Sequence, residues 1–193
     1  MLRRLIPVQL ALVSLLLATS ACAAGGRNPA PATPAARLAP DELCPPKVPD
    51  LMPTNSDGTI PAAPVSPALR PSTAAWVCHY SLPMSSSEDG FFWQLDGQAE
   101  TLPAAELGRV DELIGSAVPL SPGTPCTADA GPLYVLVVDD GQQQTAVIVE
   151  DFGCRRTQLN DLPLGGELAA TSEGSVNGNL AAPELARQLR EWV

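Results

Sequence analysis

The sequence predicts an α+β fold, in which a small antiparallel sheet is covered by one or two helices and tied by two disulfides. Three observations support this class. Short apolar stretches with two-residue alternation are separated by turn residues, which is typical of strands. Two other stretches repeat their apolar residues every three to four positions, as helices do. Beyond the N-terminal region four cysteines remain, an even number that suits two disulfides in an exported chain.

Residues 1–21 have the three-part pattern of a secretory signal peptide. Arg3 and Arg4 form a basic start, an apolar run continues to Leu17, and small residues precede Cys22. The apolar run is shorter than the stretch of about 20 residues that a membrane-spanning helix needs. We therefore expect this segment to be removed on export.

The stretch Ala18-Thr19-Ser20-Ala21-Cys22 resembles the lipobox of bacterial lipoproteins, whose cysteine becomes the lipidated first residue. Ser20 and Ala21 fit the motif, whereas Thr19 stands where leucine is usual. Ordinary signal peptidase would also cut before Cys22, because small residues lie one and three positions before the cut. The odd total of five cysteines favours lipidation, since a lipidated Cys22 leaves four to pair. A freely secreted protein with one spare thiol is the alternative.

Proline content divides the remaining chain, because residues 23–71 hold 12 of the 21 prolines. Residues 22–43 form the expected lipid anchor and a Pro/Ala-rich linker. The linker has too few large apolar residues for their burial to offset the entropy cost of ordering the chain. Residues 44–71 are expected to form a Pro-rich loop that a disulfide from Cys44 ties to the domain. The folded α+β domain is expected over residues 72–193.

Two strands are predicted at the start of this domain. Residues 74–81, AAWVCHYS, alternate, with Trp76, Cys78 and Tyr80 on one face. After a polar loop, residues 91–97, FFWQLDG, predict a second short strand that is antiparallel to the first.

A helix is predicted over residues 103–115. Its apolar positions, Leu107, Val110 and Ile114, follow the spacing i, i+3 and i+7, so one helical face is apolar. A proline in the first turn and a glycine at the end are favourable helix boundaries.

A hairpin is predicted next. Residues 133–138 are nearly all apolar, which indicates a central strand covered on both faces. Residues 145–149 are its expected partner, and Asp139-Asp140-Gly141 carries a favourable turn sequence between them.

The hairpin brings Cys126 and Cys154 within reach of each other, because these cysteines stand at its two ends. Cys44 and Cys78 then remain as the second expected disulfide. Four cysteines permit three pairings, so the pairing is a hypothesis at this point.

The chain ends with a further strand and a helix. Residues 155–159, RRTQL, extend the sheet in this interpretation. Pro183 suits the first turn of a C-terminal helix, in which Leu185, Leu189 and Trp192 share one face.

Charge excludes two classes of partner. The formal charge is −10, and removal of residues 1–21 leaves 9 basic against 21 acidic residues, a charge of −12. Nucleic acid binding needs a basic patch for the phosphates, and adhesion to anionic lipid needs a polybasic segment. We therefore expect no nucleic acid partner and no membrane contact beyond the N-terminal lipid.

No motif for a catalytic, metal or cofactor site is present, and none is predicted. His79 is the single histidine, and the adjacent Cys78 points to the other face of the strand, which argues against a Cys-His pair. G-x-S-x-G, P-loop and C-x-x-C sequences do not occur.

Adjacent carboxylates leave an enzyme as the alternative, because general acid–base work needs two carboxyl groups converging on a cleft. Adjacency in sequence does not establish convergence, and solvated turns are the simpler interpretation. The pairs are Glu88-Asp89, Asp111-Glu112, Asp139-Asp140 and Glu150-Asp151.

Phe91, Phe92 and Trp93 form the densest aromatic cluster and are the candidate interaction surface. On a two-faced strand, some of these side chains must point away from the main core. Coverage by a helix or by the Cys44 loop is the alternative interpretation.

The order of these features resembles cell-envelope lipoproteins of actinobacteria. It runs from the lipobox-like Cys22 through an Ala/Pro stalk to WVCHYS and then to CTADAGPLYVLVV and FGCRR. The resemblance implies a lipid-anchored protein on the extracytoplasmic face of the cell membrane and transfers no functional residue. The function expected is a non-catalytic binding or interaction module for an envelope protein or ligand. A spacer without a binding role is a further alternative.

Overall fold

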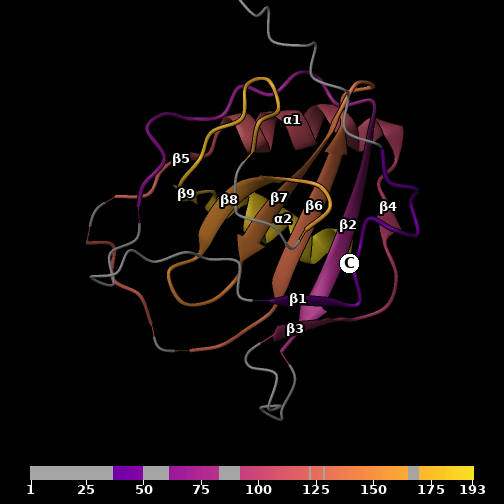
Figure 1. The fold of residues 1–193 in the computed structure, drawn as a ribbon. Helices are drawn as coiled ribbons and strands as arrows, with labels where there is room; N and C mark the ends of the chain where they lie inside the picture. Colours follow the sequence, from indigo (N-terminus) through magenta and orange to yellow (C-terminus); the bar gives the residue numbers. More distant parts are fainter. Residues whose placement is uncertain (1–36, 50–60, 83–91, 122, 128, 165–169) are drawn as a thin grey trace, which may run out of the picture. The chain divides into compact units, whose positions relative to one another are not determined.

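The structure is a computed structural model, and it describes residues 37–49, 61–82, 92–121, 123–127, 129–164 and 170–193. Within these residues it contains a nine-stranded antiparallel sheet, two α-helices and two disulfides (Figure 1). The predicted α+β class is therefore confirmed, and the domain is disulfide-containing and rich in β-structure.

In the described part of the chain, four strands precede the first helix, and five more lie between it and the C-terminal helix. The strands are β1 (Lys47–Pro49), β2 (Ala74–Ser81), β3 (Phe92–Leu95), β4 (Glu100–Thr101), β5 (Val118–Pro119), β6 (Leu133–Asp139), β7 (Gln144–Glu150), β8 (Arg156–Asp161) and β9 (Leu180–Ala181). The helices are the 3-10 turn η1 (Ala104–Glu106), α1 (Leu107–Gly115) and α2 (Pro183–Trp192). The strand order is β1-β3-β2-β6-β7-β8-β9-β5, and β4 pairs separately with β2.

The centre of the sheet is the predicted hairpin with a strand on either side. Figure 1 shows β2, β6, β7 and β8 next to one another, and all neighbours are antiparallel. All seven residues of β6 are buried, as the continuous apolar character of residues 133–138 predicts for the first six; the seventh is the charged Asp139. Asp139 pairs with Gln144, so the predicted turn spans residues 140–143, and Gly141 adopts a φ of 87° there.

Both predicted helices are confirmed, and they cover the same face of the sheet, which we call the helix face. Their buried side chains join one hydrophobic cluster with inward-facing residues of β2, β6 and β7. The helical contributors are Val110, Leu113 and Ile114 from α1 and Leu185, Ala186 and Leu189 from α2.

The opposite face, which we call the disulfide face, has a second hydrophobic core, to which β1, β3 and residues 37–46, called the N-terminal segment, contribute side chains. Leu43 and Val48 are fully buried against it. The Cys44–Cys78 disulfide joins that segment to β2, and the Tyr80 hydroxyl donates a hydrogen bond to the Pro45 carbonyl over 3.0 Å. Burial raises the pKa of Tyr80, so its hydroxyl stays protonated and continues to donate.

Packed structure begins N-terminal to residue 72, where the sequence placed the start of the folded domain. β1 pairs with β3, and Leu43 belongs to the core of the disulfide face. A three-residue strand among prolines is too short to produce a detectable period. The Cys44–Cys78 disulfide and the pairing with β3 hold β1 in the sheet, and the local pattern of β1 predicts neither of them.

The second Pro-rich stretch, residues 61–72, is bound to the loop before β9. The N–H of Ala63 donates to the Asn179 carbonyl over 2.9 Å, and that of Ala68 donates to the Gly174 carbonyl over 2.8 Å. A Cβ on Gly174 would lie 1.9 Å from the Ala68 carbonyl oxygen, so only glycine permits this approach.

Candidate functional site

Both disulfides have the predicted partners. Cys126 and Cys154 close the ends of the β6–β7 hairpin, and Cys44 and Cys78 join the N-terminal segment to β2. Disulfides form and persist in oxidising compartments, which indicates an extracytoplasmic domain. Among the described residues, no helix has the length and apolar character to cross a membrane.

The carboxylates Asp139 and Asp140 do not form a shared acidic site. Asp139 is fully buried at the end of β6 and makes an ion pair with Arg37 from the N-terminal segment. Asp140 makes an ion pair with Arg70 over 2.8 Å, from a different segment. Each charge is therefore neutralised by its own arginine.

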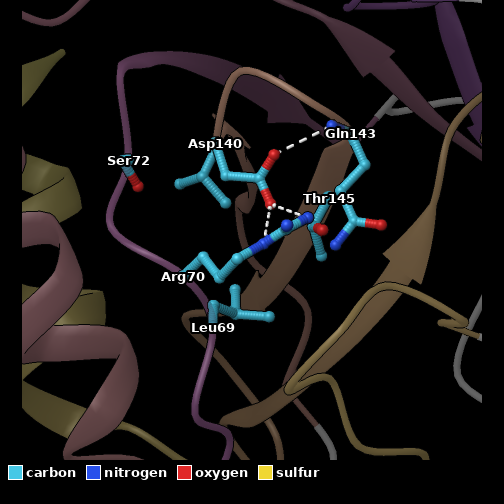
Figure 2. Close-up of a pocket in the computed structure, with 7 residues that line it drawn as sticks. Leu69, Arg70, Ser72, Asp140, Gln143 and Thr145 are labelled. Carbon is cyan, nitrogen blue, oxygen red and sulfur yellow. Dashed lines mark hydrogen bonds and ion pairs between the residues drawn. The ribbon is translucent and has the colours of Figure 1, made fainter.

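Asp140 is held in a small cluster at the hairpin turn. Figure 2 shows its carboxylate between Arg70 and Gln143. Burial favours the neutral acid, but two backbone N–H groups of the turn and the Arg70 guanidinium outweigh it and lower the pKa of Asp140. The cavity beside these groups is about 10 Å³, which holds at most one water molecule. The cluster therefore stabilises the turn and has no room for a ligand.

Glu150 and Asp151 are separated in the same way. Glu150 is 1% exposed and accepts hydrogen bonds from the Nε and Nη2 atoms of Arg156, over 2.9 and 2.6 Å. Asp151 forms an ion pair over 2.8 Å with Arg190 of α2.

The other two carboxylate pairs also give no acid–base site. Asp111 accepts hydrogen bonds from the backbone and hydroxyl of Ser72, and Glu112 pairs with Arg109 on the same helix. Glu88-Asp89 lies outside the described residues. Within the described part of the chain, the carboxylates of each adjacent pair bind different partners.

His79 lies on β2 beside one aromatic ring and one carboxylate. Its ring stacks on Tyr134 with the centroids 5.2 Å apart, and its Nδ1 lies 3.5 Å from an oxygen of Asp96. The described residues contain no group of three or more His, Cys, Asp or Glu side chains that could hold a metal ion.

The three aromatic residues of the predicted interaction surface do not form one exposed surface among the described residues. Phe91 lies outside the described residues, and Phe92 is half-buried with the Lys47 ammonium 4.2 Å from its ring centroid. Trp93 is 3% exposed, and its indole N–H donates to the Gly131 carbonyl over 3.2 Å. Trp93 therefore belongs to the core of the disulfide face.

A larger cavity opens on the disulfide face, and we call it the Trp76 pocket. Its volume is about 490 Å³, within the range of about 300–1,000 Å³ that is usual for small-molecule sites. Its apolar floor consists of Cys44, Trp76, Leu95 and Ala99, which all belong to or pack against the core of this face. The floor is therefore supported by packed side chains and by the Cys44–Cys78 disulfide.

Polar side chains surround this floor. Asp41 lies in the turn before Cys44, Gln98 in the loop after β3, and Thr101 on β4, directly opposite Trp76 of β2. Directly paired residues of adjacent strands project from the same face, which brings Thr101 beside the indole.

These polar side chains do not stabilise the described part of the fold through hydrogen bonds or ion pairs. Four polar groups of the lining make no hydrogen bond or ion pair with the described residues. They are the Asp41 carboxylate, the Gln98 amide, the Thr101 hydroxyl and the indole N–H of Trp76. By contrast, the described members of the adjacent carboxylate pairs all have protein partners. An apolar floor with unpaired polar groups around it is the usual composition of a binding site.

Sequence reasoning did not identify this pocket. It placed Trp76 correctly on the face of Cys78, but the lining comes from four segments between Pro40 and Thr101. Only the registers of β2 with β3 and β4, together with the disulfide, bring these segments together.

No family model, no curated protein and no solved structure matches the chain.

Proposed function

We propose that the protein is a non-catalytic binding module outside the cytoplasmic membrane, and that it binds its ligand or partner in the Trp76 pocket. One observation carries this proposal, namely that polar groups without partners among the described residues surround a pre-formed apolar floor. Sites of this kind bind a ligand without large rearrangement, because the apolar surface and the orienting groups are already in place.

A binding role is favoured over catalysis by the positions of the charged groups. The buried carboxylates Asp139 and Glu150 are neutralised by arginines. Among the described residues that line the pocket there is one carboxylate, Asp41, and no histidine, cysteine thiol, lysine or arginine. A single acid on an open rim has no second group with which to share a proton transfer.

The location proposed for this module is the outer face of the cell membrane. Cys22 would carry the lipid, and the Pro/Ala-rich chain between Cys22 and Arg37 would form the linker, because residues from Arg37 onward already contact the folded domain. The two disulfides support an oxidising compartment, and the odd fifth cysteine supports a separate role for Cys22.

The anchor is tested by the intact mass of the membrane-extracted protein, denatured without reduction. We expect a chain that begins at Cys22, with the mass of acyl groups added and four hydrogens missing because of two disulfides. Cys22→Ser should abolish the acyl mass and release the protein from the membrane. A wild-type chain without acyl mass would instead establish a freely secreted protein.

The binding role is tested by photo-crosslinking in intact cells. We expect a photoreactive residue at Pro40, an exposed position on the rim of the Trp76 pocket, to capture a ligand or partner. The same residue at Glu112, which is exposed on α1 of the helix face, should not capture it. Trp76→Ala should remove the adduct at Pro40. Adducts that are equal at both positions, or none at Pro40, would contradict a ligand site in this pocket.

A further inference from the structure

We infer that the ligand of the Trp76 pocket is a neutral carbohydrate. This inference rests on the proposed binding role of the pocket and adds the chemical class of the ligand. It depends on three properties of the lining: the mixture of hydrogen-bond donors and acceptors, the apolar floor, and the charge.

The lining offers donors and acceptors side by side. The Asp41 carboxylate only accepts, the indole N–H of Trp76 only donates, and the Gln98 amide does both. The Thr101 hydroxyl also donates and accepts. A sugar hydroxyl likewise donates one hydrogen bond and accepts others, so neighbouring hydroxyl groups can satisfy such a mixed set. A ligand that only accepts or only donates would leave part of this set unpaired, at a cost in affinity.

The floor supplies the complementary apolar contact. A sugar ring has a face of C–H groups between its hydroxyls, and it needs an apolar partner together with polar ones. Trp76 combines a large apolar ring with a polar N–H, and Leu95 and Ala99 extend the apolar surface beside it. The same residues would therefore contact the ring while the rim binds its hydroxyls.

Charge distinguishes a neutral sugar from charged ligands. Asp41 is the one ionisable side chain among the described residues of the lining, and it would repel phosphate or carboxylate groups. A cation would be attracted to Asp41, but it would leave the indole N–H and the amide N–H groups of Gln98 without acceptors. A lining whose described residues include no basic side chain, together with the mixed polar set, favours an uncharged polyhydroxyl ligand.

Co-sedimentation tests this inference. The probe is the insoluble polysaccharide fraction of the cell envelope from the source organism, freed of protein by protease digestion. We expect the purified full-length mature protein to bind this fraction in both low and high salt. Periodate, which cleaves the vicinal diols of sugars, should abolish the binding.

Variants connect the binding to the pocket. Trp76→Ala should weaken it by at least about tenfold, as expected for a central aromatic contact. Gln98→Ala removes an exposed side chain that has no partner among the described residues, and should weaken binding by roughly two- to tenfold. The matched controls are Trp192→Ala on the helix face and Gln142→Ala in the hairpin turn, which should bind as the wild type does. Gln98→Ala keeps the test decisive if Trp76→Ala fails to fold.

The failures of the two proposals are distinguishable. Binding that survives periodate but disappears in high salt, or no binding of the wild type to the polysaccharide, would overturn the carbohydrate inference. If photo-crosslinking at Pro40 still gave an adduct that depends on Trp76, the binding role of the pocket would stand with a ligand of another class. Binding unchanged by Trp76→Ala and Gln98→Ala would place the carbohydrate site elsewhere and also overturn the inference.

Discussion

Replacement of Cys44 and Cys78 by alanine is expected to lower the free energy of unfolding by about 4 kcal/mol. The disulfide joins positions 34 residues apart, and in the chain-entropy model its loss restores this amount of freedom to the unfolded chain. The loss should be measured by urea denaturation of the mature protein without reductant. The substitution also removes two buried sulfur atoms from the core of the disulfide face, so we expect no smaller effect.

The same substitution should impair the Trp76 pocket. Cys44 is part of its floor, and Asp41 is three residues away in the segment that the disulfide attaches to β2. We therefore expect capture at Pro40 and binding of polysaccharide to be lost under conditions where the variant is still folded.

The second disulfide provides the control for this prediction. Replacement of Cys126 and Cys154 by alanine opens a loop with a separation of 28 residues, and should cost roughly 3–4 kcal/mol. Neither residue lines the Trp76 pocket, so the folded variant should bind as the wild type does. Equal loss of binding in both double variants would contradict a specific role of the Cys44–Cys78 disulfide in the pocket.

Glu150→Gln is expected to destabilise the protein by about 3–5 kcal/mol. Glu150 is 1% exposed at the end of β7, and the Arg156 side chain that it binds is 13% exposed. Removal of one charge from a buried ion pair leaves the other without compensation in a poorly solvated position. Thermal and urea unfolding of the variant measure this effect.

Two controls separate the ion pair from a general effect of substitution. Glu191→Gln removes one charge from an exposed pair with Arg187 on α2 and should cost less than about 1 kcal/mol. The double variant Glu150→Leu with Arg156→Met removes both buried charges and should recover most of the loss, because well-packed apolar residues often replace buried ion pairs without penalty. A loss in the double variant as large as that of Glu150→Gln would contradict the explanation.

Much of the fold could be predicted because its main elements carry local signals. Residues 133–138 are continuously apolar, and in the structure β6 is buried over its whole length. The spacing of Val110 and Ile114 and of Leu185 and Leu189 predicted both helices, and these residues are their buried contacts. The positions of the cysteines at the hairpin ends also led to the correct disulfide pairing.

Other features had no local signal. The sequence suggested that Trp93 could belong to an exposed surface, whereas the structure buries it against Gly131 and Phe152, which lie far from it in the sequence. The adjacent acids Asp139 and Asp140 look alike in the sequence, but Arg37 and Arg70 reach them from separate distant segments. The position of each arginine in the sequence does not predict which carboxylate it will pair with.

Local patterns in the sequence were enough to predict the class of the fold and the course of its principal strands and helices, and they led to a hypothesis for the cysteine pairing that the structure confirms. These properties follow from periodicity and spacing, since a strand or helix must bury its apolar side chains at regular intervals along its own length. Packing in three dimensions was needed to show which face each cover occupies, which carboxylates are neutralised, and that Trp76, Thr101, Gln98 and Asp41 surround one pocket. The pocket depends on strand register and on a disulfide between distant segments. The periodicity of apolar residues within one segment does not predict which other segment it will contact.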